Sequence, residues 1–302
     1  MITIPPYLKK GDTIGLICPA GYMPAEKAQT CIRVLGEWGY AVKTGKTVGG
    51  ESQTYFSGTD EERLADLQQM LDDGDVKAIL CARGGYGTGR IIEDTRFKKI
   101  RKHPKWIIGY SDITILHSHL YSNYGIASLH SPMAGAFNDG GENNEFVLSL
   151  KNALEGNKVN YHCDPHAFNR KGVADGELVG GNLALLAHLC GTGSDIKTKG
   201  RILFIEDVGE YLYNIDRMLY QLKRNGKLSK LAGLIVGGFT ETKDNERPFG
   251  QTAYEIIWDK VKEYDYPVCF DFPVSHTDRN YALKVGVRHQ LKVGNQAVTL
   301  SD

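Results

Sequence analysis

The stretch Trp106-Ile-Ile-Gly-Tyr-Ser-Asp-Ile-Thr114 joins a short apolar run directly to the start of a helix. Its first four residues predict a buried strand, and the spacing of apolar residues over 113–123 predicts a helix. The same order occurs upstream, where a strand is expected over 12–18 and a helix over 24–38. Strands made of continuous apolar runs that alternate with helices predict a mainly parallel sheet with helices on both faces.

The length of the chain predicts more than one domain. Its 302 residues are about twice the length of a typical domain. We expect an N-terminal α/β domain over residues 1–160 and a smaller C-terminal α/β domain over residues 172–302. A polar, turn-rich stretch over 157–171 is expected to cross between them.

Charge and composition exclude several classes of partner. Lys and Arg number 36 and Asp and Glu number 36, so the net charge is zero. Nucleic acids and anionic membranes usually require a basic excess, and neither is expected to bind. The sequence has no export signal and no apolar run of about 18 residues, which predicts a soluble, cytoplasmic protein. The six cysteines are scattered singly and are expected to be buried, reduced thiols.

Ser111 lies where the strand meets the helix. A serine on such a tight turn projects its hydroxyl above the sheet edge, beside free backbone amides, as in a nucleophile elbow. Gly109, two residues earlier, is the small residue that a crowded elbow requires, although the usual second glycine is absent. The alternative is a simple helix cap, in which Ser111 or Asp112 accepts hydrogen bonds from the next turn.

A serine nucleophile needs a base and an orienting group. His117 and His119 lie on the helix after the serine, point away from its start and are expected to be surface or packing residues. His276 opens a loop after an apolar strand, and Glu206 and Asp207 end another apolar strand. Ligands bind at the carboxyl ends of strands in open α/β sheets. His276 is therefore the candidate base, and the carboxylates its candidate partners.

The glycine-rich loop Arg83-Gly-Gly-Tyr-Gly-Thr-Gly89 also follows an expected strand. Its spacing does not match G-x-G-x-x-G, and no Gly-Lys-Ser/Thr follows, so a nucleotide-binding protein is only an alternative reading. The better functional interpretation is a turn whose backbone amides stabilise an oxyanion together with the amide of Asp112. A tight connection between strand and helix with no ligand remains the other interpretation.

Five segments together resemble the LD-carboxypeptidases, a family of serine peptidases that includes murein tetrapeptide carboxypeptidase. They occur in order along nearly the whole chain: Arg83-Gly-Gly-Tyr-Gly87, Ile108-Gly-Tyr-Ser-Asp112, Leu178-Val-Gly-Gly-Asn-Leu183, Phe204-Ile-Glu-Asp207 and Ser275-His-Thr-Asp278. The resemblance implies a triad of Ser111 as nucleophile, Glu206 as orienting carboxylate and His276 as general base. It also implies a homodimer, two domains with the active site at their interface, and no metal or organic cofactor.

The substrate that this resemblance implies is a muropeptide. The enzyme would remove D-alanine from the L,D-peptide bond of a murein tetrapeptide during cell-wall recycling, through an acyl-Ser111 intermediate. The amides of Asp112 and of Gly84 or Gly85 would stabilise the oxyanion. Relatives of the microcin C self-immunity peptidases cleave aminoacyl or peptidyl nucleotide conjugates with the same triad, and that activity is the alternative.

Several assignments stay open at this level. Glu210 is a second candidate for the orienting carboxylate, although its expected place beyond the strand end favours Glu206. Arg83, Tyr86 and Asn182 are candidate substrate contacts, and Asn182 is equally suited to cap the helix that it precedes. The sequence does not specify which third residue of the tetrapeptide is accepted.

Overall fold

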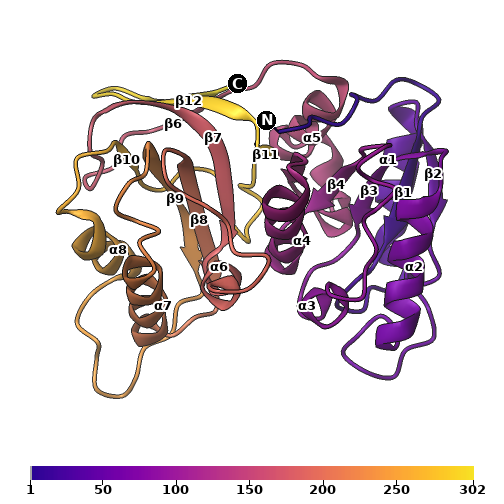
Figure 1. Cartoon of the computed structure of the whole chain (residues 1–302), viewed down its shortest axis with the longest axis horizontal. Coiled ribbons are helices and arrows are strands. Elements are labelled where there is room, and N and C mark those ends of the chain that lie inside the picture. The colour runs from indigo at the N-terminus through magenta and orange to yellow at the C-terminus, as the bar shows by residue number, and fades with distance from the viewer. Residues whose placement is uncertain (1) are drawn as a thin grey trace. The chain divides into compact units, whose positions relative to one another are not determined.

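The computed structural model describes residues 2–302 and divides into two compact units (Figure 1). The first unit runs to Asn157 and also contains Tyr281–Lys284. The second consists of Lys158–Asn280 and Val285–Asp302. The return of the chain to the first unit near its C-terminal end was not predicted from the sequence.

The first unit contains a six-stranded sheet with the order β11-β5-β4-β3-β1-β2. The pairs β2–β1, β1–β3, β3–β4 and β4–β5 are all parallel, which confirms the predicted sheet type. The carboxyl ends of these parallel strands therefore meet at one edge. The strands are β1 (Thr13–Ile17), β2 (Ala41–Thr44), β3 (Val76–Cys81), β4 (Trp106–Gly109), β5 (Ser128–His130) and β11 (Leu283–Val285).

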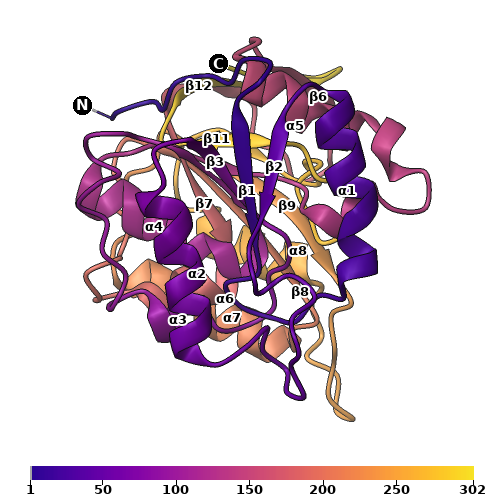
Figure 2. The same cartoon turned by 90° about the vertical axis from the view of Figure 1, so that its right-hand side faces the viewer.

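Helices flank this sheet, and Figure 2 shows α1 to one side of β1 and β2 and α2 to the other. The side chains of Thr59 and Glu62 form a capping box at the start of α2. The single helix predicted over 113–123 is instead a 3₁₀ turn (Ser111–Ile113), then α4, then a π turn (Leu120–Tyr124). The α-helices are α1 (Ala25–Glu37), α2 (Asp60–Asp72), α3 (Thr88–Ile91), α4 (Thr114–His119) and α5 (Glu145–Glu155).

The second unit contains a mixed seven-stranded sheet with the order β10-β9-β8-β7-β12-β13-β6. The strands from β10 to β7 pair in parallel, whereas β7–β12, β12–β13 and β13–β6 are antiparallel. The turn-rich stretch predicted over 157–171 contains one of these strands, β6, and neither β7 nor β12 was predicted. The strands are β6 (Asn160–Cys163), β7 (Gly172–Asn182), β8 (Ile202–Val208), β9 (Gly233–Thr240), β10 (Val268–Cys269), β12 (Arg288–Val293) and β13 (Val298–Ser301).

Three α-helices of the second unit follow its strands: α6 (Leu183–Leu189), α7 (Leu212–Arg224) and α8 (Ala253–Val261). Thr252 and Glu255 form a capping box at the start of α8. Four of the six cysteines are buried, as expected, and Cys163 and Cys190 are half-buried. Within residues 2–302, no helix has the length and apolar character needed to cross a bilayer.

Candidate active site

Ser111 follows β4 through a sharp turn. Its φ is +62°, in the left-handed region that a residue with a Cβ rarely adopts. Gly109 has a φ of +151°, and a Cβ there would lie 2.9 Å from Cγ1 of Ile113. The turn therefore needs glycine at 109 and holds Ser111 in a strained conformation. Both features are typical of a nucleophile elbow.

The side chain of Asp112 bonds outside the helix that it precedes. The residues that precede the 3₁₀ turn and α4 are Tyr110 and Ile113, and neither caps the helix through its side chain. Asp112 is buried, and its Oδ2 accepts a hydrogen bond of 2.8 Å from the backbone N–H of Thr88. The Asp112 carboxylate therefore links the serine turn to Thr88, the first residue of α3, which follows the glycine loop.

His117 is buried beside Gly109. It was expected to be either a surface or a packing residue, and it is a packing residue. Its Nε2 lies 2.8 Å from the carbonyl oxygen of Gly109 and must donate, because a carbonyl only accepts. Burial lowers the pKa of His117 to about 4 despite this hydrogen bond. The imidazole is therefore neutral at pH 7 and supports the backbone at Gly109.

The glycine loop packs against the serine turn. A Cβ on Gly84 would lie 3.0 Å from Cβ of Ser111 and 3.4 Å from the backbone nitrogen of Asp112. The Gly84 carbonyl accepts a hydrogen bond of 3.0 Å from the N–H of Gly21. Since a trans peptide directs its C=O and N–H to opposite sides, the N–H of Gly85 points away from Gly21.

Arg63, which no sequence pattern indicated, binds the backbone of this glycine loop. Its guanidinium is fully buried, and Nη1 donates to the carbonyl oxygens of Pro19, at 2.7 Å, and Gly87, at 3.0 Å. The same guanidinium pairs with Asp60. One side chain on α2 therefore connects the loops that follow β1 and β3. Nothing in the local sequence separates Arg63 from the exposed charged residues of the same helix.

Arg83 and Tyr86, two of the candidate substrate contacts, lie on the exposed side of the glycine loop. The ring of Tyr86 is tilted against Phe56, with 6.0 Å between ring centroids. Both side chains are thus accessible, and their contact with substrate stays a prediction.

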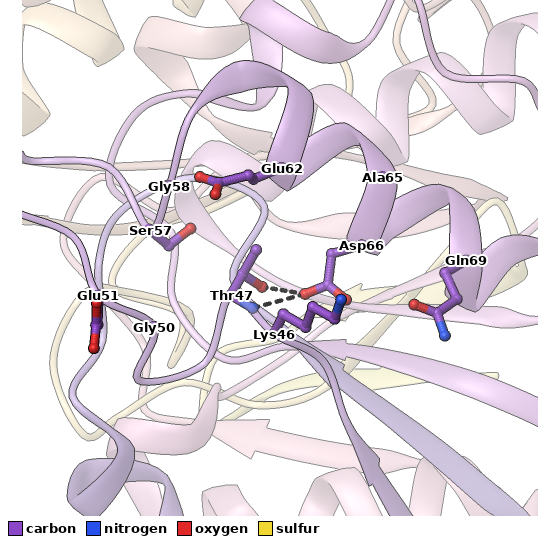
Figure 3. A pocket seen from close by; sticks show the side chains of 10 residues that line it. All are labelled: Lys46, Thr47, Gly50, Glu51, Ser57, Gly58, Glu62, Ala65, Asp66 and Gln69. Atoms are coloured by element: carbon purple, nitrogen blue, oxygen red, sulfur yellow. Dashed lines mark hydrogen bonds between the residues drawn. The ribbon is translucent and has the colours of Figure 1, made fainter.

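A pocket of about 460 Å³ is lined by α2 and by the segment between β2 and α2 (Figure 3). At its floor, Asp66 accepts hydrogen bonds from the backbone N–H of Thr47, at 2.9 Å, and from the Thr47 hydroxyl, at 2.5 Å. The Thr47 hydroxyl oxygen accepts in turn from the N–H of Cys18, at 2.9 Å. The buried polar groups of this pocket therefore fasten the end of β1, while its rim consists of exposed side chains such as Lys46 and Glu51.

In the second unit, Glu206 and His276 form a hydrogen-bonded pair. Glu206 lies on β8 and is fully buried, and its Oε2 is 2.6 Å from Nδ1 of His276. A carboxylate only accepts, so Nδ1 carries the hydrogen and the lone pair of the neutral imidazole is on Nε2. Glu210, the other candidate, lies beyond the strand and accepts a hydrogen bond from Nδ2 of Asn214, at 2.5 Å. Of the two candidates, the structure places Glu206 on the histidine.

The surroundings of His276 raise its pKa. Burial favours the neutral ring, but the hydrogen bond and the negative charge of Glu206 outweigh it, and the charges of Asp207 and Glu241 add to their effect. The pair therefore makes His276 a stronger base than an exposed histidine.

Asn182 and Asp207 hold the start of α6 beside this pair. Oδ1 of Asn182 accepts from the N–H of Leu185, at 3.2 Å, and its Nδ2 donates to Oδ1 of Asp207, at 2.8 Å. Oδ2 of Asp207 accepts from the N–H of Ala184, at 3.0 Å. Burial and the neighbouring Glu206 raise the pKa of Asp207 to about 6, against the effect of the hydrogen bonds from the Val208 N–H and from Asn182. Asn182 thus acts as the helix cap, and a contact between Asn182 and substrate stays a prediction.

Two glycines of β9, which the sequence analysis also missed, allow His276 to reach Glu206. A Cβ on Gly237 would lie 2.1 Å from the carbonyl oxygen of Val274, and a Cβ on Gly238 would lie 2.6 Å from Cβ of Ser275. The N–H of Gly238 donates to the Val274 carbonyl, at 2.9 Å. The segment before His276 therefore lies directly on β9. The Gly-Gly pair after the apolar run of β9 was the available signal.

A strained serine turn at the end of a parallel strand and a hydrogen-bonded Glu–His pair are the groups that serine hydrolases use. Models of the LD-carboxypeptidase N-terminal and C-terminal domains match residues 14–131 and 175–291. The chain belongs to the LD-carboxypeptidase family of serine peptidases, as the resemblance predicted. Among the residues described, no group of three or more His, Cys, Asp or Glu side chains is arranged to hold a metal ion.

Individual relatives match over nearly the full length. The probable murein peptide carboxypeptidase of Bacillus subtilis is 38% identical over 301 residues, covering 98% of this chain and 93% of that protein. The crystal structure of muramoyltetrapeptide carboxypeptidase from Oxalobacter formigenes is 30% identical with a TM-score of 0.86, covering 96% of this chain and 98% of that one. The microcin C7 self-immunity protein MccF, bound to adenosine monophosphate, is similar in fold, with a TM-score of 0.87 at 23% identity, covering 99% and 98%.

Proposed function

We propose that this protein is a serine LD-carboxypeptidase that removes D-alanine from the L,D-peptide bond of murein tetrapeptides. The proposal assigns Ser111 as nucleophile, His276 as general base and Glu206 as orienting carboxylate. The 2.6 Å hydrogen bond between Glu206 and Nδ1 of His276 is the observation that carries it, because it leaves the Nε2 lone pair to accept a proton. The mechanism requires the Ser111 hydroxyl and this imidazole to meet during the reaction.

The first half of the reaction forms an acyl-enzyme. Nε2 of His276 accepts the hydroxyl proton as Oγ of Ser111 attacks the carbonyl carbon of the scissile bond. The resulting oxyanion is stabilised by the backbone N–H of Asp112 and by a second N–H from the glycine loop. Of Gly84 and Gly85, we favour Gly85, whose N–H is directed away from Gly21. A single donor of this kind contributes about 3–4 kcal/mol to the transition state in other enzymes.

The first half ends when the protonated His276 gives its proton to the departing amine of D-alanine, the C–N bond breaks and the acyl-Ser111 ester remains. In the second half, water attacks this ester while Nε2 of His276 takes one of the water protons. When the ester bond breaks, His276 gives that proton to Oγ of Ser111, which restores the hydroxyl. Throughout, Glu206 keeps Nδ1 protonated and stabilises the imidazolium that forms in each half.

The names of two relatives support the substrate class. The Bacillus subtilis protein is named for murein peptides and the Oxalobacter formigenes protein for muramoyltetrapeptide. A cytoplasmic role in cell-wall recycling and a homodimeric assembly remain predictions. The assembly would be measured by light scattering coupled to size-exclusion chromatography.

The decisive experiment incubates the protein with murein tetrapeptides that carry a diamino acid or lysine at the third position. We expect release of D-alanine, and we expect Ser111→Ala to abolish it. Ser229→Ala is the matched control, because Ser229 is exposed and its hydroxyl bonds only to the local backbone, at Gly226. Release that persists in Ser111→Ala would exclude the proposed triad.

The alternative substrate class is an aminoacyl or peptidyl nucleotide conjugate, which the likeness to the MccF fold brings into consideration. The same triad would cleave it, so the substrate comparison distinguishes the two activities. Faster turnover of an aminoacyl sulfamoyl adenosine than of the tetrapeptide would favour the conjugate. Saturable binding of a dinucleotide with hydrolysis of neither substrate would favour the nucleotide-binding alternative.

A further inference from the structure

The two residues that flank His276 carry hydroxyl groups that are bonded to each other. Oγ of Ser275 lies 2.7 Å from Oγ1 of Thr277. Oγ of Ser275 is also 3.0 Å from the carbonyl oxygen of Arg279 and 3.1 Å from the backbone nitrogen of Thr277. The N–H of Arg279 donates to Oγ1 of Thr277, at 3.2 Å. Four hydrogen bonds therefore join residues 275, 277 and 279 around the histidine.

The chemistry of the partners fixes the direction of each bond. The Arg279 carbonyl only accepts, so Ser275 must give it the single hydrogen of its hydroxyl. The hydrogen between the two hydroxyls then comes from Thr277. Oγ of Ser275 accepts this hydrogen and the Thr277 N–H, which uses both of its lone pairs. Every donor and acceptor in the network has one consistent role, and the loss of either hydroxyl breaks at least two bonds.

The network is anchored to the sheet. Ser275 is buried, and its Cβ lies against the backbone of Gly238 on β9, where any side chain would collide with it. The preceding carbonyl, of Val274, is bonded to the N–H of Gly238. By contrast, residues 276–279 belong to no helix or strand, and Thr277 is exposed. The hydroxyl network thus connects this irregular segment to Ser275, the residue that packs against β9.

We propose that Ser275 and Thr277 are positioning residues that fix the backbone on both sides of His276, so that Nδ1 faces Glu206. The inference rests on the proposed function, in which His276 is the general base. Neither hydroxyl needs to touch substrate. Their effect is to hold the imidazole in the orientation in which Glu206 stabilises its protonated form, and this orientation affects turnover rather than substrate binding.

The test compares Thr277→Val, Ser275→Ala and the conservative Thr277→Ser on the tetrapeptide. We expect Thr277→Val to lower kcat by roughly 10-fold or more, since a misplacement of about 1 Å in a catalytic group can cost 100-fold. KM should stay within about twofold. Thr277→Ser, which keeps the hydroxyl, should restore kcat. Thr299→Val on β13 is the control, because it makes the same substitution in the same unit outside this loop.

The pH profile of kcat/KM supplies a readout that a merely structural role would not move. The negative charges that act on His276 are those of Glu206, Asp207 and Glu241. Of these, Glu206 requires the correct orientation of the ring for its hydrogen bond. Thr277→Val should therefore shift the acidic limb of the profile to lower pH, and Thr277→Ser should not.

The outcomes separate this inference from the proposed function. If Thr277→Val and Ser275→Ala keep kcat within twofold and leave the acidic limb in place, the positioning role is wrong, even where Ser111→Ala is inactive. A fall in kcat with an unchanged limb, or one that Thr299→Val reproduces, also overturns it. Activity that survives in His276→Ala would instead overturn the proposed function. Because Thr277 is exposed, Thr277→Val tests the inference even if Ser275→Ala fails to fold.

Discussion

Replacement of Glu206 by glutamine removes the charge beside His276 while keeping the shape of the side chain. The amide oxygen of glutamine can still accept the hydrogen bond that Nδ1 now gives to Oε2, at 2.6 Å. The variant loses the negative charge that stabilises the imidazolium formed in each half of the reaction. In an Asp-to-Asn variant of another Ser-His-Asp enzyme, turnover fell by about 10⁴-fold. We therefore expect kcat to fall by roughly 10²–10⁴-fold, which corresponds to about 3–5 kcal/mol in the activation free energy.

The pH dependence of this variant has a defined sign. In the wild type, Glu206 outweighs burial and raises the pKa of His276, so the rate increases as pH rises through that raised pKa. Without the charge, burial favours the neutral imidazole and the pKa falls. The acidic limb of kcat/KM in Glu206→Gln should consequently lie at lower pH than in the wild type.

The assay is D-alanine release from murein tetrapeptide between pH 5 and 9, with Glu210→Gln as the matched control. Glu210 carries the same charge four residues away and contacts Asn214 rather than the histidine. We expect its substitution to leave kcat within about twofold. The reasoning would be refuted if Glu206→Gln kept the wild-type acidic limb, or if Glu210→Gln produced the larger loss.

Three further predictions concern the glycines and the second buried carboxylate. Gly109→Ala places a Cβ 2.9 Å from Ile113 at a φ of +151°, and thermal unfolding should show a loss of about 1–3 kcal/mol; an unchanged melting temperature would contradict the crowded turn. Gly237→Ala places a Cβ 2.1 Å from the Val274 carbonyl and should lower kcat by at least about 10-fold, because it displaces the segment before His276; wild-type kcat would exclude this role of β9. Burial raises the pKa of Asp207 from 3.8 to about 6, so this group stabilises the fold at low pH and loses roughly 3 kcal/mol of that stabilisation as pH rises from about 4 to 7. Denaturant unfolding of Asp207→Asn should show a weaker pH dependence than the wild type over this range, and identical curves would contradict the assignment.

Local features of the fold were predictable because they depend on neighbouring residues. The capping box of Thr59 and Glu62 is determined within four positions, and the apolar run Trp106–Gly109 is a strand with the predicted bounds. The same holds for the strained turn at Ser111, where Gly109 and the start of a helix were visible in the sequence. Strands with less regular patterns escaped prediction, since β7 is rich in glycine and β12 alternates with charged residues.

The sequence by itself determined the two α/β halves, the serine turn and a short list of histidines and carboxylates at strand ends. Only the tertiary structure showed that Glu206, and not Glu210, bonds to His276, because this contact depends on which side chain faces the segment that packs against β9. It also revealed the roles of Arg63 and of the Gly237–Gly238 pair, whose most distant partners lie 44 and 37 positions away in the chain. Backbone preference is a property of a few adjacent residues. The approach of one buried group to another depends on strand register and packing, which no local pattern contains.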